Sequence, residues 1–311
     1  MSPALKPQLQ IHLCVLLWGF TAILGKLIAL PAMALVWWRM ALVLAVLVCL
    51  PRVWHGLCAL PGKLVAIYAG IGVLVTMHWL TFFGAIKLAN ASVAVTCIAL
   101  GPVFLSLIEP WIAGRRIDPR EILLGIAVVP GVALVVGGIP SGMRIGLLVG
   151  ISSALFVAGF SALNKRYVER ADALLVTTLE LGTGALLLSV LLPWSSNGGF
   201  DARVFAVPAP RDLALLALLA FACTLLPFTL SLVALRKLSA FSALLAVNLE
   251  PVYAIVLAIV LLGEQRELGA GFYAGVIVIL STVFVHPWLM RRRHVAAAET
   301  LAVAEVKNLA D

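Results

Sequence analysis

The chain has 311 residues, of which 63% are apolar and only 12% charged, and its mean hydropathy is +1.13. A water-soluble domain carries about a quarter of its residues as charged side chains, so this composition excludes a soluble enzyme. The formal net charge of +8 would favour nucleic-acid binding in a soluble protein, but in a membrane protein it first reports the orientation of the loops.

Long apolar segments, bounded by charge, proline or glycine, follow one another along the whole chain. They lie at Leu9–Ala29, Ala32–Leu50, Leu64–Ile86, Ala89–Gly114, Ile122–Ile139, Ile145–Leu163, Ala173–Leu192, Leu213–Leu235, Ser239–Gly263 and Gly269–Leu289. A membrane-spanning helix needs about 20 predominantly apolar residues. The pattern therefore predicts an all-α membrane protein with ten transmembrane helices. The polar segment Ser195–Arg211 is expected to be the longest loop, and residues 291–311 a cytoplasmic tail.

The basic residues are distributed unequally between alternate loops. Most of the 22 lysines and arginines fall in the loops on the side of the N-terminus, whereas few fall on the other side. Because cytoplasmic loops carry the excess of Lys and Arg, we expect both termini in the cytoplasm. This asymmetry accounts for the positive charge, and nucleic acid is not expected as a partner.

The two halves of the chain are related in sequence. At a constant offset, Lys87, Pro102 and Gly114 correspond to Arg236, Pro251 and Gly263. We therefore predict two five-helix repeats, residues 1–139 and 140–290. Since five is odd, the second repeat enters the membrane from the opposite side, which makes the protein an inverted repeat. Inverted repeats are the physical basis of alternating access around a site near the membrane midplane.

These features resemble the EamA-type branch of the drug/metabolite transporter superfamily. The resemblance rests on Trp18-Gly19-Phe20 with Lys26, on Gly101-Pro102-Val103-Phe104, and on Leu249-Glu250-Pro251-Val252 with Gly263-Glu264. The segment from His78 to Phe83 is similar to the aromatic amino-acid exporters of that superfamily. The resemblance implies export of amino acids, related metabolites or amphiphilic drugs across the bacterial inner membrane, through a cavity lined by the third, fourth, eighth and ninth spans. In the first half, Gly114-Arg115 departs from the Gly263-Glu264 of the second half.

Candidate substrate-binding residues lie on those four spans. Trp79 aligns with Phe228, and facing aromatic rings can sandwich a flat or apolar side chain; the alternative is packing against lipid. Glu250 lies deep in a span, where it either binds a substrate amine or carries a proton, or is a structural residue. The remaining candidates are His78, which is either a proton shuttle or a hydrogen-bonding residue, and Phe83, Thr96, Leu245 and Asn248.

A second group is predicted to line or gate the pathway. Arg39 either neutralises a substrate carboxylate or extends to the outer interface, and it aligns with Glu180 in the second half. The other members of the group are Trp18, Thr21, Phe156, Phe160 and Ser161, for which packing against lipid is the alternative. Pro102 and Pro251 each leave a backbone carbonyl, that of Ile98 or Val247, without its helical donor. Such carbonyls can receive an ammonium group.

Three classes of membrane protein remain at this stage. An intramembrane hydrolase needs a nucleophile with a base, or metal ligands, and the sequence contains no HExxH and no GxSxG. A channel does not require an inverted repeat with prolines in the middle of spans. A transporter is the leading interpretation, with no catalytic residues, no metal and no cofactor. We expect a monomer in the lipid bilayer whose partner is a small-molecule substrate. Broad export of amphiphilic drugs or other metabolites is the alternative to amino-acid export.

Overall fold

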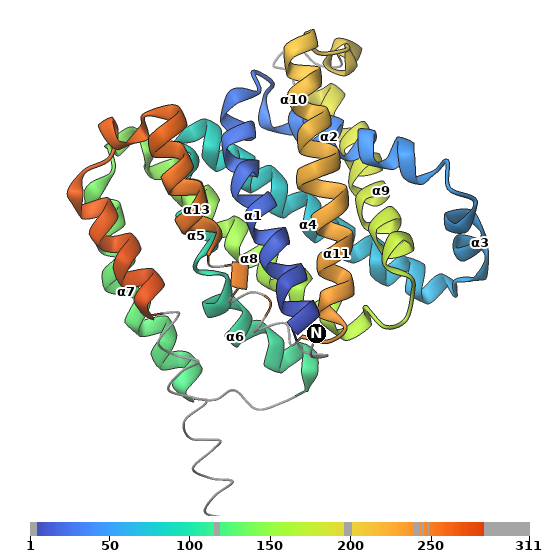
Figure 1. Cartoon of the computed structure of the whole chain (residues 1–311), viewed down its shortest axis with the longest axis horizontal. Coiled ribbons are helices and arrows are strands. Elements are labelled where there is room, and N and C mark those ends of the chain that lie inside the picture. The colour runs from blue at the N-terminus through green and yellow to red at the C-terminus, as the bar shows by residue number, and fades with distance from the viewer. Residues whose placement is uncertain are drawn as a thin grey trace, which may run out of the picture.

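The computed structural model describes residues 5–114, 119–195, 201–238, 243, 246–247 and 249–282. In these ranges the chain is helical and contains no strand (Figure 1). The elements are α1 (Leu5–Leu27), α2 (Ala32–Leu47), α3 (Pro51–Ala59), α4 (Gly62–Leu88), α5 (Ala91–Ile98), α6 (Gly101–Ala113), α7 (Pro119–Gly138), η1 (Ser141–Met143), α8 (Arg144–Tyr167), α9 (Ala173–Leu191), η2 (Leu192–Trp194), η3 (Ala202–Phe205), α10 (Pro210–Ala220), η4 (Phe221–Leu225), α11 (Leu226–Leu235), α13 (Glu250–Leu257), η5 (Ala258–Leu262), η6 (Glu264–Arg266) and a last helix, Ala270–Thr282.

Six of the described helical segments are long and apolar enough to cross a membrane, and the bent pair α2 and α3 makes a seventh. Three shorter apolar helices, Ile126–Gly138, Glu250–Leu262 and Ala270–Thr282, fall below that length. The prediction of ten spans is therefore not confirmed by helix length, although the protein is all-α in the part that the structure describes.

Four of the predicted spans differ in detail from the structure. The run Ala32–Leu50 ends as a helix at Leu47 and is followed by α3 at an angle of 93°. Pro51 explains the break, because a residue that precedes proline avoids the helical region of backbone conformation. The expected span Ala89–Gly114 is one apolar segment, Ala91–Ile112, in which a turn at Ala99 and Leu100 separates α5 from α6. Pro102 has no N–H with which to continue the hydrogen bonds of α5.

The second half is interrupted in a similar way. The expected span Leu213–Leu235 consists of α10, one π-helical turn (η4) and α11. The expected span Ser239–Gly263 ends in a second π-helical turn, η5, and its first residues lie largely outside the described ranges. The expected loop Ser195–Arg211 contains the short helix η3, and α10 starts before its end, at Pro210.

The repeat is visible in the backbone at two corresponding glycines. Gly114 ends α6 and Gly263 ends η5, both with φ of 70°, and they are the only positive-φ residues among those described. A glycine in the left-handed conformation is a common way to end a helix, because it has no Cβ to clash with the preceding turn. The same local geometry thus recurs at matching positions in the two halves.

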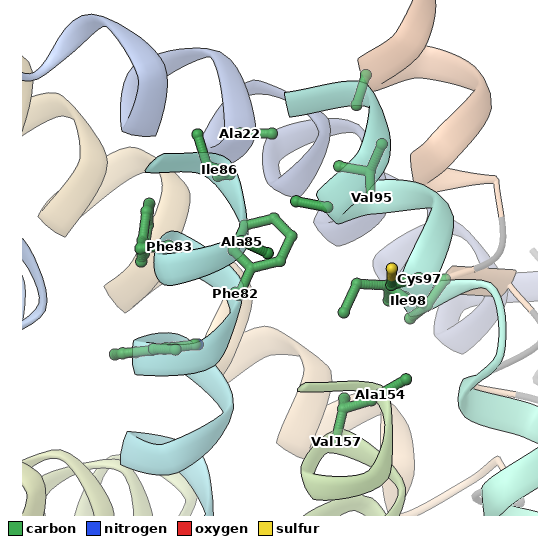
Figure 2. Close-up of a cluster of buried hydrophobic side chains, with 14 of the residues drawn as sticks. Ala22, Phe82, Phe83, Ala85, Ile86, Val95, Cys97, Ile98, Ala154 and Val157 are labelled. Carbon is green, nitrogen blue, oxygen red and sulfur yellow. The ribbon is translucent and has the colours of Figure 1, made fainter. Parts of the chain in front are cut away.

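The interior is filled with apolar side chains from both halves. Helix α4 lies at the centre and packs against α8 and α9. Figure 2 shows part of this core: Phe82 points from α4 into the space between α5 and α8, near Ile98 and Val157. Phe83 and Ile86 lie on another side of α4 and pack toward Gly25 of α1. At one edge of the molecule α7 lies beside the helix Ala270–Thr282, and the backbone N–H of Gly269 donates to the carbonyl of Gly138 at 2.9 Å (Figure 1).

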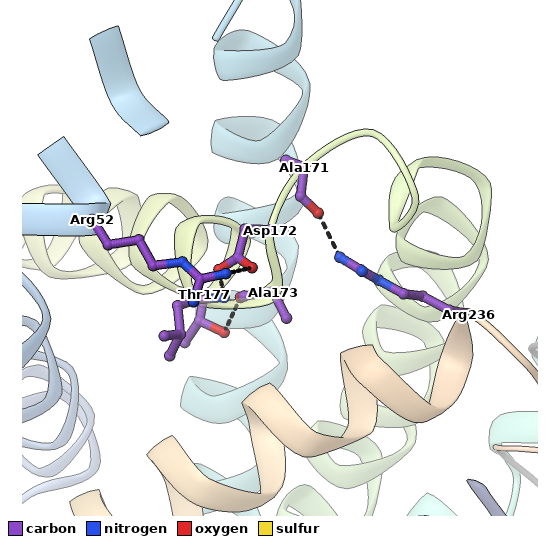
Figure 3. Close-up of polar contacts among 7 residues, drawn as sticks. Arg52, Ala171, Asp172, Ala173, Thr177 and Arg236 are labelled. Atoms are coloured by element: carbon purple, nitrogen blue, oxygen red, sulfur yellow. Dashed lines mark hydrogen bonds and ion pairs between the residues drawn. The ribbon is translucent and has the colours of Figure 1, made fainter. Parts of the chain in front are cut away.

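Polar contacts join helix ends at two opposite faces of the molecule. At the first face Arg52 pairs with Asp172 at 2.8 Å and Arg236 donates to the carbonyl of Ala171 at 2.7 Å (Figure 3). At the second face Lys87 donates to the carbonyl of Ile28, and the backbone N–H of Ala29 donates to Asp212. All four contacts connect helix ends that are distant in sequence. Those of Arg52 with Asp172 and of Ala29 with Asp212 join the two halves, and the other two lie within one half.

Candidate functional site

A cavity of about 120 Å³ lies between the two halves of the molecule. This volume is several times what one water molecule requires. The walls are mostly apolar but contain an arginine, a histidine, a glutamate and an asparagine. The lining residues are Ile11, Trp18, Thr21, Arg39, His78, Trp79, Phe82, Ile98, Val157, Phe160, Ser161, Asn164, Phe228, Ser231, Leu232, Leu235, Ala243, Val247 and Glu250.

Arg39, on α2, is the strongest cation in this cavity and is only 2% exposed. Its guanidinium carbon lies 3.7 Å from the centroid of the Trp79 ring. Its Nε donates to the hydroxyl of Thr224 at 2.5 Å, and Nη2 donates to the carbonyl of Cys223 at 3.4 Å. Nη1 is buried and has no hydrogen-bond partner. The prediction that Arg39 extends to the outer interface is therefore wrong, because the π-system and two oxygens hold it inside.

The partners of Arg39 exist because of a proline in the eighth predicted span. Pro227 has no N–H, so the carbonyl of Cys223, four residues earlier, lacks its usual helical donor. The chain forms the π-helical turn η4 at this point, and the Thr224 hydroxyl donates to the carbonyl of Leu219 at 2.6 Å. Local π-helical turns frequently mark functional sites. Here the irregular backbone gives a buried guanidinium two acceptors.

Glu250 is the anionic group of the cavity and is 6% exposed. It is the first residue of α13, and Pro251 follows it in the first turn, where a missing backbone N–H costs no helical hydrogen bond. The N-terminus of a helix favours a negative charge. Arg39 and Glu250 line the same cavity, yet no ion pair within 4.0 Å joins them. The cavity thus holds a cation and an anion that do not touch.

The aromatic residues are arranged differently from the expected sandwich. The ring centroids of Trp79 and Phe228 lie 6.0 Å apart with an interplanar angle of 75°. This is direct edge-to-face contact, so no third ring fits between them in this conformation. The face of Trp79 is occupied by Arg39 instead.

His78 on α4 is fixed by the facing helix α8. Its Nδ1 lies 3.1 Å from the carbonyl oxygen of Ser153 and 2.8 Å from the Ser153 hydroxyl, which itself donates to the carbonyl of His78. A carbonyl only accepts hydrogen bonds, so Nδ1 carries the proton. The neutral ring therefore has its lone pair on Nε2, and it lies between the rings of Phe82 and Phe160 at centroid distances of 6.1 and 5.5 Å.

A second buried carboxyl lies behind the cavity wall. Asn164 on α8 lines the cavity, and its Nδ2 donates to Oε2 of Glu180 on α9 at 3.3 Å. Glu180 is fully buried and does not itself line the cavity. Glu180 therefore lies one side chain behind the surface of this cavity, and its role in the pathway stays a prediction.

The structure brings nine of the fifteen predicted site residues to one cavity: Trp18, Thr21, Arg39, His78, Trp79, Phe160, Ser161, Phe228 and Glu250. Phe83, Thr96, Phe156 and Glu180 do not line it. Phe83 points toward Gly25 of α1, and the hydroxyl of Thr96 donates to the carbonyl of Ser92 in its own helix. Phe156 lies one helical turn before Phe160 in α8 and is only partly buried. Leu245 and Asn248 lie outside the described residues.

Sequence analysis missed several lining residues. Asn164, Phe82 and Ser231 were not singled out, although the repeat aligns Phe82 with Ser231 and so offered a signal for that pair. Ile98 and Val247, whose carbonyls precede the two prolines, both line the cavity. Asn164 lies near the end of an apolar run, next to Lys165. A single polar residue at that place does not belong to any repeating pattern that would indicate a cavity wall.

The described residues contain no group of three or more histidine, cysteine, aspartate or glutamate side chains that can hold a metal ion. All five cysteines are free thiols.

Comparison with known proteins defines the class. One family model, the EamA-like transporter family, matches twice, at residues 6–137 and 144–286. A solved crystal structure of another protein superposes with a TM-score of 0.62 at 18% sequence identity, covering 92% of this chain and 98% of that one. No curated protein matches the sequence.

The fold and the cavity are thus those of a multi-pass membrane transporter of small molecules. The chain belongs to the EamA-like transporter family, whose members are transporters and not enzymes.

Proposed function

We propose that the protein exports zwitterionic amino acids, aromatic and other neutral ones, across the bacterial inner membrane. The observation that carries the proposal is the pair Arg39 and Glu250, one cation and one anion that line the same cavity without an ion pair between them. A free amino acid presents a carboxylate and an ammonium at a fixed short separation. It therefore neutralises both side chains at once.

Arg39 and Glu250 each have a feature that favours binding of such a ligand. Nη1 of Arg39 is buried without a partner, and an unpaired buried donor costs about 1–3 kcal/mol, more for a charged group. A substrate carboxylate removes this cost. Glu250 lies across the cavity at the start of α13, where an ammonium can be received close to Ile98, whose carbonyl ends α5.

The side chain of the substrate meets apolar and aromatic walls. Trp18, Phe82 and Phe160 line the cavity beside His78. Apolar pockets discriminate weakly, by about 1–3 kcal/mol for each methylene, so we expect overlapping export of several amino acids. The same walls support the alternative, broad export of amphiphilic drugs or other metabolites, which needs no contact with Arg39.

The transport mechanism that we propose is alternating access in a monomer with ten crossings. The three shorter apolar helices bring the seven longer segments to ten, and the polar contacts sort alternate helix ends to two faces. The face of Arg52, Arg170 and Arg236 is the more basic, so it faces the cytoplasm. The cavity reaches Ile11, Asn164 and Leu235, near the helix ends at that face.

The decisive experiment uses the purified full-length chain in sealed vesicles. Saturable uptake of radiolabelled phenylalanine, accelerated by unlabelled phenylalanine on the opposite side, supports an amino-acid carrier. Competition by leucine and tyrosine, but not by phenylethylamine or phenylpropionate, supports recognition of both charges. Uptake of amphiphilic cations without any amino-acid flux favours the alternative, and flux that does not saturate indicates a channel.

A further inference from the structure

Glu180 is a buried carboxyl to which the proposed binding mode gives no role. It lies in the middle of α9 and is fully buried. Its Oε2 accepts one hydrogen bond, from Nδ2 of Asn164 at 3.3 Å, and its Oε1 has no partner. Oδ1 of Asn164 is likewise buried without a partner. Two adjacent side chains are therefore each left with one unsatisfied oxygen.

No cation compensates a negative charge on Glu180. Besides side chains at the outer ends of these helices, such as Lys63 and Lys87 on α4 and Arg166 on α8, the titratable and charged side chains on the elements around it are Arg39 on α2, Arg52 on α3, Tyr68 and His78 on α4, Lys165 on α8, and Arg236 at the end of α11. Each cation among them is bound elsewhere: Arg39 to Thr224, Arg52 to Asp172, Lys165 to the carbonyl of Leu235 and Arg236 to that of Ala171. The Tyr68 hydroxyl donates to the carbonyl of Tyr167.

Glu250 and Glu180 therefore lie in opposite environments. Glu250 lies at a helix N-terminus in the same cavity as Arg39, and both features compensate a carboxylate. Glu180 lies in the middle of a helix with one amide donor. An ionised carboxylate that is buried and unpaired costs several kcal/mol. Two carboxyls whose environments differ in this way take different roles.

A proton on Glu180 turns one of the two orphaned oxygens from an acceptor into a donor. When Glu180 is a neutral acid, the O–H on Oε1 is a donor and Oδ1 of Asn164 is the acceptor that lacks one. Together with the existing bond from Nδ2 to Oε2, this O–H gives the acid and the amide complementary donors and acceptors. When Glu180 is ionised, both orphaned atoms are acceptors and neither can satisfy the other.

We propose that Glu180, with Asn164, is a proton-carrying site that couples amino-acid export to proton movement in the opposite direction. The inference rests on the proposed function, since it concerns the coupling of that transport. Glu180 holds the proton as a neutral acid while the cavity is without substrate. Asn164 lies between Glu180 and the cavity. A rotation of its side chain lets water from the cavity reach Oε1 of Glu180 and take the proton, which leaves the carboxylate behind.

The direction of coupling follows from charge. An ammonium group in the cavity favours the ionised form of a nearby carboxyl, so binding of the amino acid releases the proton. Return of the empty carrier requires the proton to bind again. Competition of this kind moves the substrate and the proton in opposite directions.

The test measures substrate and proton flux in the same vesicles. The full-length protein is reconstituted with a pH-sensitive dye inside, and a gradient of phenylalanine is imposed. Wild-type protein is expected to move protons against the phenylalanine flux. Glu180→Gln is expected to keep phenylalanine counterflow and lose the proton signal to the level of empty vesicles. Its amide N–H replaces the acid O–H as donor to Asn164, which preserves folding. Glu169→Gln, an exposed residue beyond the end of α8, is the matched control and should retain both fluxes.

The outcomes separate this inference from the proposed function. Wild-type counterflow without any proton movement overturns the inference and leaves amino-acid export standing. Proton movement by Glu180→Gln at the wild-type level also overturns it. If wild-type protein shows no counterflow, the proposed function fails, and infrared spectra of the resting protein still decide the charge state. A neutral carboxylic-acid band that disappears in Glu180→Gln but persists in Glu250→Gln supports the proton site, and its absence from wild-type protein overturns it.

Discussion

The guanidinium carbon of Arg39 lies 3.7 Å from the centroid of the Trp79 ring. The contact joins α2 to α4 at the wall of the cavity, and Arg39 reaches it from a position that is 2% exposed. A desolvated cation over an aromatic face is stabilised by about 2 kcal/mol. These contacts hold the guanidinium group in one orientation and leave its Nη1 without a hydrogen-bond partner.

Arg39→Lys is expected to weaken phenylalanine binding. Lysine keeps the charge but lacks the planar fork that contacts Trp79, Thr224 and Cys223 together. The stacking, worth about 2 kcal/mol, is present before substrate binds and holds the cation in place, so its loss lowers affinity indirectly, by up to about thirtyfold if the whole contribution is needed for positioning. Titration of the purified protein with phenylalanine measures the effect. The control is Arg52→Lys, since the Arg52–Asp172 pair is largely exposed; equal losses in both variants would contradict a role of Arg39 in the cavity.

Glu250→Gln is expected to abolish recognition of the substrate amine while the protein is still produced and folded. Removing one partner of a buried charge pair costs about 2–5 kcal/mol. Affinity for phenylalanine should therefore fall strongly, whereas affinity for phenylpropionate, which has no amine, should change little. Competition assays with both compounds check this. Unchanged phenylalanine transport would reduce Glu250 to a structural role.

Gly72→Ala is expected to destabilise the protein by about 1–3 kcal/mol, because an overpacked interface must move apart. A Cβ at Gly72 would lie 2.4 Å from the carbonyl oxygen of Glu180 and 2.8 Å from its Cα. Gly70 on the same helix has nothing within 4 Å of such an atom, so Gly70→Ala is the matched control. Thermal unfolding in detergent compares the two. Equal stability of both variants would show that α4 and α9 are not in this close contact.

Glu264→Ala is expected to loosen the contact between the two halves at one face. The Glu264 carboxylate accepts the backbone N–H groups of Ala91 and Ser92 and the Ser92 hydroxyl, at 3.0, 2.9 and 2.7 Å. Hydrogen bonds to a charged group contribute about 1.5–3 kcal/mol each, so the melting temperature should fall clearly. Glu267→Ala removes a single bond to Asn90 and should cost less; the reverse order would contradict this interpretation.

Cysteine accessibility tests the orientation. In a background without the five natural cysteines, Gly142→Cys is expected to react with an impermeant thiol reagent in intact cells, and Glu169→Cys only after the membrane is opened. Both positions are exposed and lie near contacts of opposite faces, Asn90 with Met143 and Arg236 with Ala171. Reaction of both from the same side would end the proposal of two inverted halves.

Several features of the fold could be predicted from the chain alone. Apolar periods indicated the helices, and the correspondence of Gly114 with Gly263 anticipated two helix ends of equal backbone geometry. The helix breaks at Pro51 and Pro102 could not be predicted from the sequence, since a proline in an apolar run is equally compatible with a kinked but continuous helix. The lengths of the individual helices depend on such breaks, as the division of the run Ala89–Gly114 into α5 and α6 shows.

The sequence by itself determined that this protein is an all-α membrane protein with a repeated architecture, and which polar residues lie within its apolar segments. Only the tertiary structure decided their roles. Arg39 and Glu180 occupy aligned positions, yet one lines the cavity and the other lies behind Asn164. The physical reason is that the stability of a buried charge depends on partners from other helices. Thr224, Trp79 and Asn164 are distant from these charges in sequence, and helix packing alone brings them into contact.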